Sequence, residues 1–233
     1  MFFLLWLLPL NATSAIERWG LVPAFWIDGI QWVDLLTVAT SMFLHVDLWH
    51  VAGNVVFLYF FGRLVESRLG ASRFLTLYAL SGLVAALSQI GVDPFSTIPM
   101  VGASGAISGV LGAAVLLAPR ERLTLWTPFT LFIPVTLTLF SFGALYLTLQ
   151  FFGVLVGGTS IAFWAHIGGF SAGWLTTPFL RQIERGSTAC NRPKSSSKQR
   201  RNGARPGPAP GRGYRTYSVT DATGRTYLFH ESV

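Results

Sequence analysis

The chain has 233 residues, of which 52% are hydrophobic and only 12% are charged, a composition outside the usual range of soluble globular domains. The formal net charge of +7 does not indicate a nucleic-acid partner, because 11 of the 17 Lys and Arg residues lie after residue 180 and not on the apolar part of the chain. A single cysteine, Cys190, excludes an intramolecular disulfide. We therefore expect an all-α integral membrane protein.

The apolar runs, taken in chain order, predict a bundle of membrane-spanning helices. The start, MFFLLWLLPL, has ten residues before Asn11, which is about half a crossing by length. It is either the outer half of a truncated first helix, which we prefer, or an interfacial segment of a five-span protein. Four later runs are each long enough to span a bilayer: residues 46–66, 71–91, 103–119 and 162–180.

A further uncharged run follows Arg122 and is too long for one crossing. It contains Pro128 and Pro134, which lack the amide hydrogen that a continuous helix uses. We therefore expect an interfacial segment at 123–136 and another spanning helix at 137–154.

Charged residues predict the orientation and the limits of the membrane domain. Cytoplasmic loops are enriched in Lys and Arg, and the loops near residues 63–73 and 120–122 are basic, whereas 11–45, 92–101 and 155–161 contain one basic residue in all. We expect a membrane domain at 1–183 and, at 184–212, a disordered basic linker rich in Pro, Gly and Ser. Residues 213–233 alternate weakly around a Gly-containing turn, which predicts a small β-hairpin.

Polar groups in three of the predicted helices fall at one depth. Ser104 lies 16 residues before Arg120, and His166 lies 15 residues before Arg181, so both are roughly 22 to 24 Å above the cytoplasmic boundary at 1.5 Å rise per residue. His50 and Asn54 are four residues apart, hence on one helix face, and bracket the same depth relative to the inner arginines. The topology therefore predicts that these four side chains meet.

Simpler explanations exist for some of the small residues. Gly105 and Gly109, like Gly169 and Gly173, have the four-residue spacing that lets helix backbones approach closely. Ser108 is expected to bond the carbonyl one turn back along its own helix. Histidines inside a membrane are harder to explain in this way, because intramembrane ionisable groups are costly and usually functional.

A hydroxyl and an imidazole at one depth supply a nucleophile and a general base, the minimum for acyl transfer. Ser104 begins its helix, where free amide hydrogens and the helix dipole favour developing negative charge. No Asp or Glu lies in the predicted crossings at this depth, so the residues favour a Ser–His dyad over a triad.

The sequence resembles the rhomboid intramembrane serine proteases. The resemblance rests on HVDLWHVAGN (45–54), GASG (102–105) and AHIGGFSAG (165–173). It implies a six-helix bundle that cleaves transmembrane substrates near the outer membrane face without a metal or cofactor. By motif position it implies Ser104 as nucleophile, His166 as general base, and an oxyanion hole made by His50, Asn54 and the Ser104 backbone amide. His45, Gly102 and Gly105 then support the site.

Two departures from the family pattern accompany the resemblance: the short first helix, and Ser108 where several members have a tyrosine that stacks on the catalytic histidine. We expect a multi-pass protein of a bacterial inner membrane with its active site toward the periplasm or exterior and its tail cytoplasmic. Two alternatives stay open, an inactive rhomboid-like protein that binds membrane clients and a metal protein using His45, His50 and His166.

Overall fold

The computed structural model describes residues 12–27, 29–125, 133–157, 161–190, 214–220 and 226–232. The segment expected to form a first helix, residues 1–10, lies outside the described residues, and so does the predicted linker from residue 191 onward. The chain divides into two compact units, Met1–Arg192 and Pro193–Val233.

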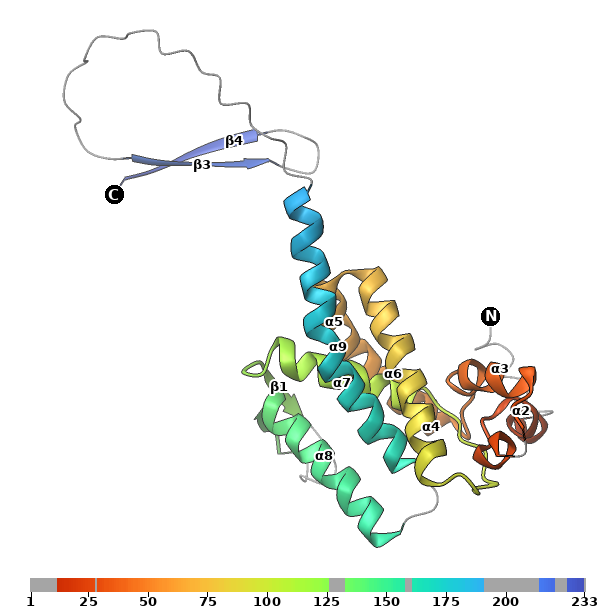
Figure 1. Ribbon diagram of the computed structural model, residues 1–233. Coiled ribbons are helices and arrows are strands. Elements are labelled where there is room, and N and C mark those ends of the chain that lie inside the picture. Colours follow the sequence, from red (N-terminus) through yellow and green to blue (C-terminus); the bar gives the residue numbers. More distant parts are fainter. Residues whose placement is uncertain are drawn as a thin grey trace, which may run out of the picture. The chain divides into compact units, whose positions relative to one another are not determined.

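Helices form most of the first unit (Figure 1). Short N-terminal helices, drawn in red and orange beside the bundle, come first: α2 (Ala12–Trp19), the 3-10 turn η1 (Pro23–Trp26) and α3 (Trp32–Ser41). The bundle then follows: α4 (Leu48–Phe57), the π-turn η2 (Leu58–Gly62), α5 (Arg63–Leu69), α6 (Ala71–Val92), α7 (Ser104–Leu117), α8 (Leu139–Val156) and α9 (Phe163–Cys190). Helices are therefore confirmed at the predicted positions to within a few residues, apart from the end of α9.

Three helical stretches in the described part of the chain are long and apolar enough to cross a membrane: Leu48–Leu69, Ala71–Val92 and Leu139–Val156. Local chemistry fixes where they begin. Asp47 caps α4 by accepting a hydrogen bond from the amide of His50 at 2.7 Å. Gly70 separates α5 from α6 at a φ of +80°, a backbone conformation that favours glycine.

Two segments differ from the sequence-based expectation. The interfacial segment contains two short strands, β1 (Arg122–Leu125) and β2 (Val135–Thr138), which pair antiparallel. The last helix continues to Cys190, well beyond the apolar run that ends near residue 180. Polar residues lower hydropathy without breaking a helix, and no proline follows Pro178 until Pro193.

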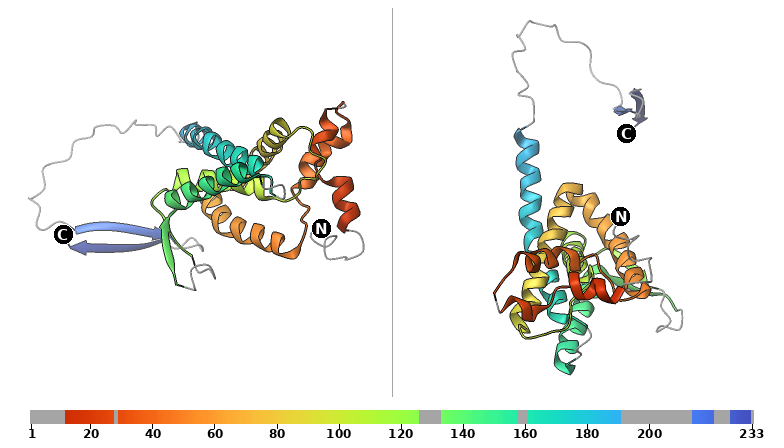
Figure 2. Two further views of the ribbon diagram at one scale, coloured as in Figure 1. Left: turned by 90° about the horizontal axis from the view of Figure 1, so that it is seen from below. Right: turned by 90° about the vertical axis from the view of Figure 1, so that its right-hand side faces the viewer.

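The centre of the bundle is α7, whose residues from Gly105 to Val115 are all buried. It packs against α6 and α9, which also pack against each other, and Figure 2 shows the bundle from two further sides. Close backbone contact makes this possible: a Cβ on Gly173 would lie 1.8 Å from the carbonyl oxygen of Gly109, and one on Gly169 would lie 2.0 Å from that of Gly105. The predicted role of these glycines in helix approach is confirmed.

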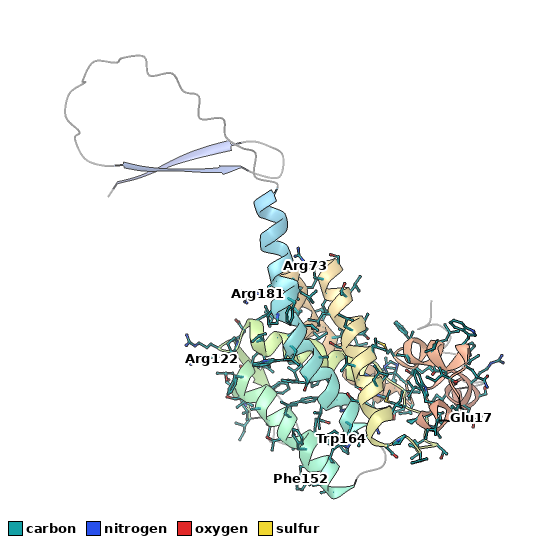
Figure 3. All side chains as sticks on the ribbon, viewed as in Figure 1. Glu17, Arg73, Arg122, Phe152, Trp164 and Arg181 are labelled. Atoms are coloured by element: carbon teal, nitrogen blue, oxygen red, sulfur yellow. The ribbon has the colours of Figure 1, made fainter. Side chains whose placement is uncertain are left out.

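The two ends of the bundle differ in their side chains. Figure 3 shows Arg73 and Arg181 at one end, whereas Trp164 and Phe152 lie at the opposite end. Basic residues are enriched at the cytoplasmic side, and tryptophan is enriched at membrane interfaces. This distribution agrees with the orientation that the loop charges predict.

The second unit contains one β-hairpin within the described residues. Strand β3 (Tyr214–Thr220) pairs antiparallel with β4 (Thr226–Ser232), from Tyr214 opposite Ser232 to Thr220 opposite Thr226. The strands lie in the segment where the sequence predicts a small hairpin.

Candidate active site

Ser104 is the first residue of the buried helix α7. The chain enters this helix through Gly102, whose φ of +115° favours glycine. Two backbone hydrogen bonds hold the entering loop, one from the amide of Gly102 to the carbonyl of Ser41 at 2.9 Å and one from Met100 to Leu21 at 2.7 Å. The amide hydrogens of a first helical turn have no partner within the helix, so Ser104 lies beside donors that the helix itself does not use.

His166 reaches Ser104 from the first turn of α9. The distance between His166 Nε2 and Ser104 Oγ is 2.9 Å, a hydrogen bond. The helices can come this close because α7 and α9 touch backbone to backbone at Gly105 and Gly169, directly beside the pair. The structure thus brings together two residues that the sequence places 62 positions apart.

His50 and Asn54 flank the serine from α4. The His50 ring packs on Gly102, where an added Cβ would lie 2.7 Å from Nε2. Among the described residues, His50 Nδ1 and Asn54 Nδ2 are buried nitrogens without a hydrogen-bond partner. Unpaired buried polar atoms are unusual in proteins, and both residues line a cavity of about 230 Å³ together with Ser104 and His166. The site therefore holds nitrogen atoms that a developing oxyanion could satisfy.

The other residues singled out from the sequence lie around this centre. The His45 ring contacts the His50 ring edge to face, with centroids 5.0 Å apart. Gly105 leaves room for α6, since a Cβ there would lie 2.6 Å from the Cβ of Ala85. In the described part of the chain no three His, Cys, Asp or Glu side chains are grouped to hold a metal ion.

Two residues of α8 complete the surroundings of His166, and the sequence reasoning did not identify either. Gln150 Oε1 lies 2.9 Å from His166 Nδ1, so the imidazole is bonded on both nitrogens. The Tyr146 ring lies beside the imidazole, with centroids 6.3 Å apart and an interplanar angle of 40°. A signal was present: Gln150 is an uncharged amide inside an otherwise apolar run, and Tyr146 is on its helix face, four residues earlier.

Ser108 links α8 to the nucleophile's helix. Its hydroxyl donates to the carbonyl oxygen of Ser104 at 2.7 Å, so the predicted bond to the preceding turn is confirmed. Its Oγ also bonds the Tyr146 hydroxyl. Several members of the family that the sequence resembles have a tyrosine at the position of Ser108 on α7. Here the aromatic ring beside the histidine is Tyr146 of α8, whose hydroxyl bonds Ser108.

A second, larger cavity has a volume of about 730 Å³. Its lining includes Ser104, His166, Ser41 of α3, Gln89 of α6 and Asp93. Most of the remaining lining of this cavity is apolar, and Trp49, Phe57 and Leu111 line the smaller cavity. Ser104 and His166 therefore line both cavities.

The chain is similar in sequence to known proteins. The family profile described as the rhomboid domain matches residues 31–183. RHOMBOID-like protein 12, mitochondrial, of Arabidopsis thaliana is 33% identical over 159 residues, 61% of this chain and 46% of that protein. Rhomboid protease GluP of Bacillus subtilis is 36% identical over 92 residues, which are 40% of this chain and 17% of that protein.

Rhomboid protease GlpG of Yersinia enterocolitica is also similar, at 28% identity over 171 residues that make up 72% of this chain and 55% of that protein. The chain thus spans about half, or less, of the length of these relatives.

Proposed function

The chain belongs to the rhomboid family, and from this premise we propose that it is an intramembrane serine endopeptidase in which Ser104 is the nucleophile and His166 the general base. The observation that carries the proposal is the 2.9 Å hydrogen bond between Ser104 Oγ and His166 Nε2, next to cavities inside an apolar bundle. A hydroxyl paired with an imidazole in this way is the arrangement used in covalent acyl transfer.

The reaction proceeds in two halves. His166 Nε2 takes the hydroxyl proton as Ser104 Oγ bonds to the substrate carbonyl carbon. The same proton then passes to the amide nitrogen, whose bond to that carbon breaks, leaving an acyl-enzyme. Water next loses a proton to His166 Nε2 and attacks the ester, and the returned proton restores the Ser104 hydroxyl.

The oxyanion formed in each half needs hydrogen-bond donors. Asn54 Nδ2 and His50 Nδ1 are buried and unpaired among the described residues, and the amide of Ser104 is at the start of a helix. We assign His50, Asn54 and the Ser104 amide to this role because preorganised donors act most strongly where water is excluded.

Asn54→Ala is expected to lower kcat by about 10²- to 10³-fold while leaving KM nearly unchanged, because an oxyanion donor acts in the transition state. The measurement is steady-state cleavage of a transmembrane peptide in liposomes. Asn54→Asp is the matched control, since its carboxylate keeps the shape but donates no hydrogen bond, and it should be impaired as well. Full activity in both variants would contradict the assignment.

Substrates of the proposed enzyme are transmembrane proteins, because the serine opens to cavities within the bundle. A peptide bond inside a helix is shielded, so segments with weak helix formers such as Gly and Ser near the outer membrane face should be cleaved preferentially. A bacterial inner membrane remains a prediction, since the relatives include mitochondrial as well as bacterial proteins.

A fluorescent fluorophosphonate tests the proposal directly, since it reacts with activated serines. The wild-type chain in detergent is expected to be labelled, and Ser104→Ala is expected to lose all labelling. Ser88→Ala is a suitable control, because Ser88 is a helix serine whose hydroxyl bonds Val84 of its own turn at 2.8 Å. Absence of labelling in a folded wild-type chain would instead favour the inactive, client-binding alternative.

A further inference from the structure

Gln150 occupies an unusual position on α8. Only one narrow face of this helix is buried against the bundle. Its buried residues, spaced by whole helical turns, are Leu139, Gly143 and Gln150. Neighbouring large side chains such as Leu149 and Phe151 are exposed at the protein surface. A buried amide is costly without hydrogen bonds, and Gln150 Oε1 meets this need at His166 Nδ1, 2.9 Å away.

That contact favours one of the two nitrogens of His166 as the site of the proton. A neutral imidazole has one N–H group and one lone pair. A carbonyl oxygen such as Gln150 Oε1 only accepts, so His166 Nδ1 must donate, and the lone pair of Nε2 then faces the Ser104 hydroxyl at 2.9 Å. This is the tautomer that a general base requires.

We propose that Gln150 is a positioning residue that holds His166 in the Nδ1–H tautomer, so that Ser104, His166 and Gln150 form a relay. The inference rests on the proposed protease function. Gln150 supplies a group that orients the imidazole, which the predicted Ser–His dyad lacks. A neutral amide does this without placing an ionised carboxylate in the apolar bundle, which would be costly.

Tyr146 keeps Gln150 in place. The single hydrogen of the Ser108 hydroxyl is donated to the carbonyl of Ser104, so in the bond between Ser108 and Tyr146 the tyrosine is the donor. This bond fixes α8 to α7 one turn below the nucleophile. Because Gln150 follows Tyr146 by one helical turn, its amide is presented to His166 at the level of Ser104.

Two substitutions of equal length separate this role from packing. Gln150→Met keeps an unbranched side chain but loses the strong acceptor, whereas Gln150→Glu keeps an acceptor oxygen. For the full chain in detergent, Gln150→Met should lower the maximal rate of fluorophosphonate labelling by about 10- to 100-fold, part of a general base's contribution, with the half-saturating probe concentration unchanged. The folded fraction of Gln150→Glu should stay within about threefold of wild type, because the acceptor persists, while the cost of burying a carboxylate lowers its stability.

Thr148→Val is the control on the same helix. Thr148 is exposed, and its hydroxyl bonds Ala144 of its own helix at 2.9 Å, so this variant should label at the wild-type rate. Nitrogen-15 NMR of labelled histidine, with the signal assigned by His166→Asn, should show the wild-type proton on Nδ1 and its loss or redistribution in Gln150→Met.

The outcomes are distinguishable from those of the protease proposal. A wild-type spectrum with the His166 proton on Nε2 overturns the inference whether or not any variant folds. Equal labelling rates and tautomers in wild type and Gln150→Met also overturn it, while leaving the protease proposal intact. If the wild type shows the Nδ1–H tautomer that Gln150→Met loses but is never labelled, the protease proposal fails and the positioning of His166 by Gln150 holds.

Discussion

Ser104→Ala is expected to lower cleavage of a transmembrane peptide in liposomes by at least about 10⁴-fold, the loss seen when the nucleophile of a serine hydrolase is removed. The physical reason is that no acyl-enzyme can form without Oγ, whereas the cavities and the flanking donors of α4 would persist. Substrate affinity should therefore change little. Product formation at fixed substrate and enzyme, followed by mass spectrometry, measures the effect.

The paired variant His166→Ala gives a stricter test of the same prediction. Ser104 and His166 share one hydrogen bond at 2.9 Å and would act as a unit, so each single variant and the double variant should have the same residual rate. If the two residues acted independently, the fold-loss in rate of the double variant would be the product of the two single fold-losses. A double variant much slower than both single variants, or a Ser104→Ala chain with wild-type turnover, would contradict the dyad.

The meeting of Ser104 with His166 could be predicted because two simple quantities determine it. Each residue lies a similar number of residues from an inner arginine, and helices that run in the same direction convert equal residue counts into equal heights. The glycine spacings on α7 and α9 then predict which faces touch. The structure agrees with both arguments in the contact of Gly109 with Gly173.

The contribution of α8 could not be predicted in the same way. Its sequence is apolar around most of its circumference, so periodicity does not reveal which side faces the bundle. The rotation of α8 is instead set by tertiary contacts such as Gly143 against Val115, where a Cβ would lie 2.6 Å from Cγ2. Only that rotation turns Tyr146 and Gln150 toward His166.

The end of α9 and the strands β1 and β2 were not predicted, for a related reason. Hydropathy reports where a chain can be buried in lipid, and α9 continues past its apolar part to Cys190 because backbone hydrogen bonding does not require apolar side chains. The pairing of β1 with β2 brings together segments on either side of Pro128, and a four-residue strand has too few positions for alternation to be recognised.

The backbone contact between α7 and α9 at Gly109 and Gly173 predicts a large effect on stability. Gly173→Ala is expected to lower the free energy of unfolding by about 1 to 3 kcal/mol or more, the usual cost of overpacking, because the new Cβ would lie 1.8 Å from the carbonyl oxygen of Gly109. Backbone atoms cannot rotate away as a side chain does, so α7 and α9 must separate. Denaturant titration of helical circular dichroism in mixed micelles measures the change.

Gly91→Ala is the matched control for this substitution. Gly91 lies in α6, where a new Cβ would meet no atom of the described residues within 4 Å, so alanine should be neutral there or stabilise by up to about 1 kcal/mol through helix propensity. Separation of α7 from α9 also moves His166 away from Ser104, so the folded fraction of Gly173→Ala should label more slowly than wild type. Equal stability of the two alanine variants would show that the backbone contact does not hold the dyad together.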